Sequence, residues 1–151
     1  MPLTSKHKGD ACEMLVAAEL TLAGIPAMKM PDNWPHYDVI AQPEEGSPQR
    51  ISVKARAYRV ERSHRIGYRY AGDFEWLAAV ILMPPTDDKE YQRYIYFIPR
   101  TIFEERVTSA GSRARADDCY CAIDQLMDDF ADYRDNFQLS PTGKGNGGDH
   151  Q

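Results

Sequence analysis

An aspartate, a lysine and an upstream glutamate stand in this chain in an order that suits phosphodiester hydrolysis. Asp38 begins a short apolar segment, Lys54 lies in the next one, and Glu13 lies in an apolar stretch near the N-terminus. Hydrolysis needs a nucleophilic water, neutralisation of the charge that develops on the phosphate, and stabilisation of the leaving oxygen. A divalent cation held by carboxylates supplies all three, and a lysine beside it holds a phosphate oxygen. The sequence therefore predicts a site for Mg2+ or Mn2+ at Asp38, with Lys54 directed at the scissile phosphate.

Neighbouring residues are expected to complete this site. The backbone carbonyl of Val53 would add an oxygen ligand, and Glu13 would bind the metal directly or through a water. Ser52 stands where a second carboxylate is expected. Because Mg2+ is commonly held by one or two carboxylates plus waters and substrate phosphate, Asp38 and Glu13 meet that minimum. The hydroxyl of Ser52 lowers the expected affinity for the metal.

Each of these residues also has an ordinary structural interpretation. Asp38 could cap the turn before its strand, and Lys54 and Arg56 could form the solvated face of an edge strand. Glu13 could pair with a lysine of the first helical turns, where the helix dipole also favours a carboxylate. The sequence alone leaves these interpretations open.

The elements that must position these residues are one helix and three strands. Apolar residues recur at helical spacing over 6–23, with Thr4 or Ser5 as the N-cap and Gly24 at the end. Side chains alternate across a strand, so Lys54 and Ser52 are expected on one face and their neighbours in the core. The predicted strands are 27–30, 37–41 and 50–57.

Later segments predict further strands and helices. The apolar run 76–83 is typical of a strand buried on both faces, and 93–98 alternates as a strand. Pro99 suits the first turn of a short helix that ends near residue 106, and 122–133 predicts a surface helix. Trp34, Phe74, Trp76 and Phe97 are expected in the core or in the shell of residues around it.

These elements predict an α/β fold with a mixed sheet of about five strands flanked by helices. The 151 residues suit one domain, over 1–139, with a glycine-rich tail over 140–151 that is expected to be disordered. The three cysteines are too few for a secreted disulfide framework, and no apolar stretch is long enough to span a bilayer. We therefore expect a cytoplasmic protein without membrane association.

The positive charge of the chain is concentrated rather than general. The net charge of −5 disfavours a protein that coats nucleic acid, yet seven arginines and lysines lie between Arg50 and Arg69 against one acid. The segment 58–70 is expected to be an exposed loop or an irregular strand pair, in which tyrosines such as Tyr68 stack on bases or sugars. A solvated basic face is the alternative. The residues expected to contact DNA are Arg56, Arg59, Arg62, Arg65 and Arg69.

These motifs, taken in order, resemble the PD-(D/E)XK nuclease superfamily. The resemblance rests on Gly9-x-x-x-Glu13, Tyr37-Asp38 and Ser52-Val53-Lys54, and it covers roughly 5–106. In particular, the chain resembles small domains related to archaeal Holliday junction resolvases and to homing-endonuclease-like bacterial proteins. The resemblance implies a restriction-endonuclease-like core, a magnesium-dependent endonuclease acting on DNA, and a homodimer able to cut two strands. The catalytic residues that it implies are Glu13, Asp38, Ser52 and Lys54.

Two other functions remain open from the sequence. A domain of the same fold could bind DNA or a protein partner without cutting, with Ser52 as the mark of lost chemistry. A plain interaction module could instead use the acidic segment 117–135, which carries seven aspartates against one arginine.

Overall fold

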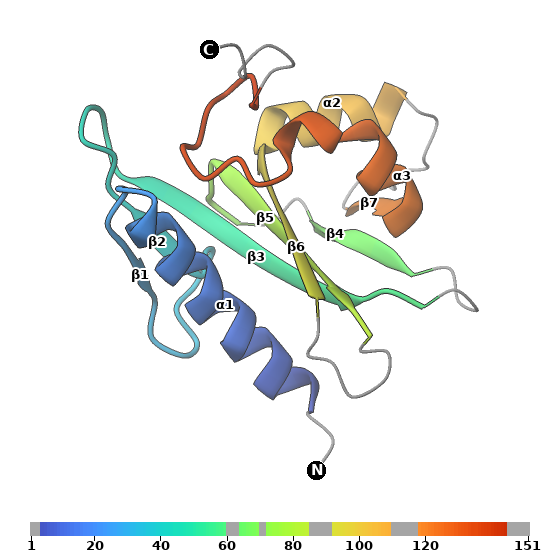
Figure 1. Cartoon of the computed structure of the whole chain (residues 1–151), viewed down its shortest axis with the longest axis horizontal. Coiled ribbons are helices and arrows are strands. Elements are labelled where there is room, and N and C mark those ends of the chain that lie inside the picture. The colour runs from blue at the N-terminus through green and yellow to red at the C-terminus, as the bar shows by residue number, and fades with distance from the viewer. Residues whose placement is uncertain (1–3, 60–63, 70–71, 85–91, 110–117, 145–151) are drawn as a thin grey trace.

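A mixed sheet forms the centre of the computed structural model, which describes residues 4–59, 64–69, 72–84, 92–109 and 118–144. Within these ranges the sheet has five strands in the order β1-β2-β3-β5-β6, and only β3 and β5 run parallel. Helices lie on both sides of it (Figure 1), which confirms the predicted fold class. The strands are β1 (Ala27–Lys29), β2 (Val39–Ala41), β3 (Gln49–Ala57), β5 (Trp76–Met83) and β6 (Gln92–Pro99).

Helix α1 (Ser5–Leu22) lies along β1, β2 and β3 (Figure 1). The Thr4 hydroxyl accepts a hydrogen bond from the His7 backbone N–H at 3.1 Å, which caps the first turn. Gly24, with φ of 102°, ends the helix as predicted. The buried side of α1 packs on alternate residues of β2 and β3, including Ile51 and Val53. This half of the fold matches the prediction to within a few residues.

The second layer contains a separate two-stranded sheet. Strand β4 (Arg65–Arg69) pairs antiparallel with β7 (Asp118–Ala122), with Tyr68 opposite Cys119. Both residues are buried, as are Ile66 and Cys121. The predicted basic segment, expected as an exposed loop or an irregular strand pair, therefore contains a strand whose three central residues are buried. The partner of this strand comes from a distant segment that carried no pairing signal.

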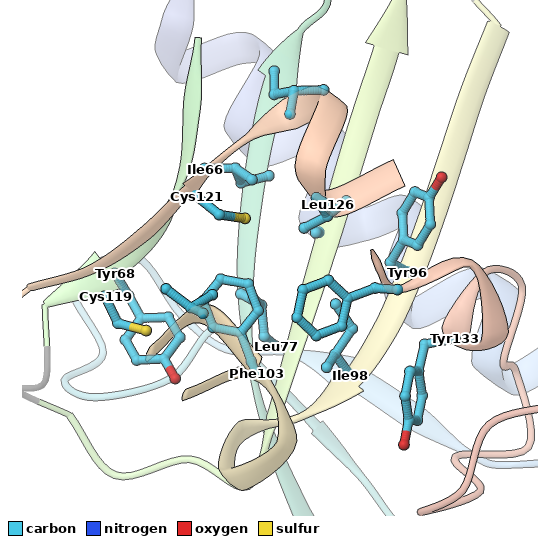
Figure 2. Packing of buried hydrophobic residues seen from close by; sticks show 14 of the residues in the cluster. Ile66, Tyr68, Leu77, Tyr96, Ile98, Phe103, Cys119, Cys121, Leu126 and Tyr133 are labelled. Carbon is cyan, nitrogen blue, oxygen red and sulfur yellow. The ribbon is translucent and has the colours of Figure 1, made fainter. Parts of the chain in front are cut away.

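Helices complete this layer against the other face of the main sheet. Figure 2 shows Phe103 and Leu126 meeting Leu77 and Ile98 of the main sheet, with Tyr133 nearby. The helices are α2 (Arg100–Ser109), α3 (Ile123–Asp129) and the 3-10 turn η1 (Ala131–Tyr133). The three cysteines are free thiols, and burial raises the pKa of Cys121 to about 12.

Order extends beyond the predicted domain end at residue 139. The Tyr133 hydroxyl donates to the Pro141 carbonyl at 2.8 Å, and the Lys144 backbone N–H donates to the Asp132 carbonyl at 2.8 Å. These contacts attach residues 140–144 to η1, whereas 145–151 lie outside the described residues. Among the described helices, none has the length and apolar character needed to cross a membrane.

Candidate functional site

Asp38 links the end of β1 to β3. Its backbone N–H donates to the Ile51 carbonyl at 2.9 Å, and its carbonyl accepts from Met30 at 2.8 Å. Its carboxylate Oδ2 accepts from the Val53 backbone N–H at 2.8 Å. The side chain therefore holds a strand fifteen residues away rather than capping its own turn, and a carboxylate retains further acceptor capacity after one such bond.

Val53 and Lys54 are neighbours on β3, but their functional groups point in different directions. The N–H and C=O groups of one residue in a strand point to the same edge, so the Val53 carbonyl faces the edge on which Asp38 lies. The Val53 side chain packs with the core under α1. Because side chains alternate, Ser52 and Lys54 face the opposite side of the sheet, toward β4 and β7.

A cavity of about 460 Å3, here called the Lys54 pocket, opens on that side. Asp38, Ser52 and Lys54 all line it. Ser52 is deep, with 6% of its surface exposed, whereas Lys54 is half-buried. The remaining lining residues are His36, Arg69 and the aromatic residues Trp34, Tyr37, Tyr68, Phe74 and Tyr120.

A second, smaller cavity of about 190 Å3 lies on the α1 side and is here called the Glu13 pocket. Asp38, Tyr37 and Trp34 line both pockets. The Glu13 pocket is mainly charged. Glu13, Asp10, Asp32 and Lys6 line it, and Lys29 lies close to Glu13. Asp38 is therefore the carboxylate common to two cavities of different character.

Glu13 has an ion-pair partner that the sequence did not indicate. The Lys29 ammonium lies 3.6 Å from its carboxylate, whereas Lys6 pairs with Asp10 at 3.0 Å. Burial raises the pKa of Glu13 above its usual range, and the negative charge of Asp38 raises it further. The two carboxylates therefore repel each other, and Lys29 offsets part of that repulsion.

The donor set can be compared with what a divalent cation requires. In the described ranges no group of three or more histidine, cysteine, aspartate or glutamate side chains is gathered tightly enough to hold a metal. The available oxygens are the carboxylates of Asp38 and Glu13, the Val53 carbonyl and the Ser52 hydroxyl. One or two carboxylates suffice for Mg2+ when waters and substrate phosphate complete its shell, so these residues fit a hard cation of that kind.

The arginines predicted to contact DNA have different surroundings. Arg56 donates from Nε to the Arg65 carbonyl at 3.2 Å, so it joins the end of β3 to β4. Arg69 lies at the Lys54 pocket and 3.7 Å from an Asp118 oxygen. The side chains of Arg56, Arg65 and Arg69 are exposed, as is that of Arg59. Arg62 lies outside the described residues.

Two aromatic residues are placed differently from the expectation. Trp34, expected in the core or its shell, is 48% exposed and lies in a turn between Asn33 and His36, whose φ angles of 66° and 79° are left-handed. Tyr68, expected to stack on DNA, is 3% exposed and donates its hydroxyl to Glu104 at 2.7 Å. The breakers around Trp34 were the available signal, since a tryptophan inside a turn has little chance of reaching a core.

The fold is similar to that of a bacterial homing endonuclease, I-Ssp6803I. The superposition has a TM-score of 0.52, covers 78% of this chain and 75% of that one, and pairs residues with 17% identity. No protein-family model matches the sequence, and no curated protein sequence matches it significantly. At this level of identity the likeness shows a similar α/β fold and nothing finer.

Proposed function

We propose that this protein is a metal-dependent endonuclease that hydrolyses DNA phosphodiester bonds at a PD-(D/E)XK site. The observation that carries the proposal is the convergence of Asp38, Ser52 and Lys54 on one cavity, with Glu13 electrostatically coupled to the same aspartate. The nuclease-like fold supports it independently of these residues.

The residues have distinct roles in this site. The Val53 N–H fixes the Asp38 carboxylate, which with Glu13 supplies the anionic oxygens for Mg2+ or Mn2+. The bound ion would polarise the phosphate and lower the pKa of an attacking water. Lys54 places a positive charge beside a phosphate oxygen, where it stabilises the additional charge of the transition state.

Exposed arginines would hold the DNA backbone around this site. Arg69 reaches the Lys54 pocket itself, and Arg65 lies at the other end of the same strand. Arg56, near the end of β3, and Arg59, just beyond it, extend the positive surface. Contacts of this kind to phosphates fix the position of the duplex without reading its sequence.

The second candidate function is a DNA-binding domain of the same fold without hydrolysis. The observation that favours it is Ser52, a buried hydroxyl at the position where a further carboxylate would strengthen metal binding. Under this alternative Lys54 and the arginines still bind phosphate, but no bond is broken.

Cleavage assays distinguish the two candidates. The purified chain is incubated with supercoiled, linear and branched DNA in Mg2+ or Mn2+, together with Lys54→Ala. The nuclease proposal expects cutting that falls by about a hundredfold or more in Lys54→Ala. Lys144→Ala, which changes an exposed lysine outside both pockets, is the matched control and should cut as the wild type does. DNA binding without cutting in either metal would favour the silent domain.

A further inference from the structure

The Lys54 pocket has more aromatic surface than a phosphate site requires. Phosphate groups are held by cations, N–H groups and metal ions, and none of these contacts needs a ring. Yet Trp34, Tyr37 and Tyr120 line the pocket together with the charged residues. Its volume of about 460 Å3 is that of a small-molecule site, for which about 300–1,000 Å3 is usual. The rings therefore indicate a flat, apolar part of the ligand beside its phosphate.

The deep wall of this pocket is rigid. Tyr68 and Phe74 meet edge to face with ring centroids 4.9 Å apart, and both are buried. Glu104 accepts hydrogen bonds from the Tyr68 hydroxyl at 2.7 Å and from Arg100 Nε at 2.8 Å. The Arg100 guanidinium also lies 4.3 Å from the Phe74 ring centroid. These contacts fix the wall, so the cavity is already formed before a ligand enters. Binding to a preformed site costs little conformational entropy.

Trp34 supplies a ring at the mouth of the pocket. It is 48% exposed, and its ring meets that of Tyr37 edge to face at 6.3 Å. Its backbone N–H donates to the Pro31 carbonyl at 3.0 Å, which closes the turn that carries the indole. The indole also borders the Glu13 pocket, on the other side of Asp38. A large aromatic face is thus presented to solvent next to the proposed cleavage site.

We propose that the Lys54 pocket binds an unstacked nucleobase, with Trp34 as the ring on which that base stacks. This inference rests on the proposed function, since it names the substrate class of the same site: DNA with an unpaired nucleotide next to the scissile phosphate. Within a duplex both faces of each base are covered by neighbours, so only an extruded or unpaired base offers a face to an aromatic side chain. Extrusion costs least where the base is already unpaired. Lys54 and Arg69, which line the same cavity, hold the phosphate attached to that nucleotide.

Binding measured without metal tests the inference separately from cleavage. Fluorescence anisotropy in EDTA compares a fully paired duplex with the same duplex carrying a short central bubble. The wild type should bind the bubble about tenfold or more tightly, and Trp34→Ala should lose most of that preference. Trp34→Phe, which retains a ring, should keep much of it. Met28→Ala, an exposed apolar residue on β1 outside both pockets, is the matched control and should change nothing.

A base analogue reports the stacking directly. Emission from 2-aminopurine falls when it stacks on an aromatic ring, so 2-aminopurine in the bubble should lose emission with the wild type and keep it with Trp34→Ala. Equal affinity of the wild type for bubble and duplex would overturn the inference, as would an unchanged preference in Trp34→Ala. If the protein cuts paired DNA but shows no preference for the bubble, the base-binding inference is wrong and the nuclease proposal stands. If the protein prefers the bubble but does not cut DNA in Mg2+ or Mn2+, the nuclease proposal is wrong and the base-binding inference stands.

Discussion

The Lys54 pocket and the Glu13 pocket share Asp38 but are built from different parts of the chain. The Glu13 pocket is assembled from α1 and from the segment between β1 and β2, all within residues 6–38. The Lys54 pocket combines residues from 34 to 120 and is larger, about 460 Å3 against about 190 Å3. The first is dominated by paired acids and lysines. The second combines cations with aromatic rings.

The difference assigns cation binding to one pocket and phosphate binding to the other within one proposed site. Burial raises the pKa of Glu13, and repulsion from the Asp38 carboxylate raises it further, so the Glu13 pocket is a place where a bound cation is favourable. In the Lys54 pocket the charge is provided by Lys54 and Arg69, which attract phosphate. Asp38 lies where the cation and the phosphate would meet. The predictions below alter the shared residue first and then each pocket separately.

The largest effect is expected from Asp38→Asn, which changes both pockets. The amide oxygen can still accept the Val53 N–H, so the free energy of unfolding should change by less than about 1 kcal/mol. Loss of the common carboxylate should reduce Mn2+ affinity and lower the cleavage rate by about a hundredfold or more. Calorimetric titration with Mn2+ and a cleavage assay measure the two effects.

Asp128→Asn is the matched control for this variant, because Asp128 is exposed on α3 outside both pockets. It should behave as the wild type in both assays. A cleavage rate for Asp38→Asn within about threefold of the wild type would show that the two pockets do not act through their common carboxylate.

An intermediate effect is expected from Ser52→Asp, which adds an acid to the Lys54 pocket only. Ser52 is 6% exposed, so the new charge should lower the melting temperature of the metal-free protein. Mn2+ should restore part of that loss, because a ligand that binds the folded state stabilises it. Metal affinity should rise about tenfold, as anionic ligand count governs affinity for hard cations. Thermal melts with and without Mn2+ measure this, with Ser52→Ala as the control; an equal Mn2+ response in both variants would contradict a metal at this position.

The smallest effect is expected on the stability of the metal-free protein with Glu13→Gln, which changes the Glu13 pocket only and whose effect depends on pH. A raised pKa in the folded protein means that the charged form of Glu13 is less favourable there than in the unfolded chain. Its contribution is therefore most favourable below the ordinary glutamate pKa and is lost as pH rises through the folded value. Glu13→Gln should thus be slightly more stable than the wild type at neutral pH, with the difference vanishing below pH ~4.

Melting temperatures across this pH range measure the difference, with the exposed Glu105→Gln as the control. A Glu13→Gln variant that is less stable than the wild type at neutral pH would reverse the interpretation of the pocket. In that case the ion pair with Lys29, at 3.6 Å, would outweigh both burial and the repulsion from Asp38.

Most of the main sheet and α1 could be predicted from the sequence, because their signals are local. Helical periodicity and the Gly24 stop delimited α1, and the apolar run 76–83 is β5 as observed. The pairing of β4 with β7 could not be predicted, since the two strands are distant in sequence. The arginines of β4 also made its sequence resemble that of an exposed loop. Tyr68 was consequently assigned to the surface although its strand is buried.

The sequence by itself determined the secondary structure around the site and the order of Glu13, Asp38 and Lys54, because both depend on residue type and short-range spacing. Tertiary structure alone decided that Glu13 would pair with Lys29 and that Trp34 would line both pockets beside Asp38. It also decided that rings from distant strands would line the Lys54 pocket. Contacts of this kind depend on how separate segments pack together, and packing leaves no pattern that is readable along a single stretch of chain.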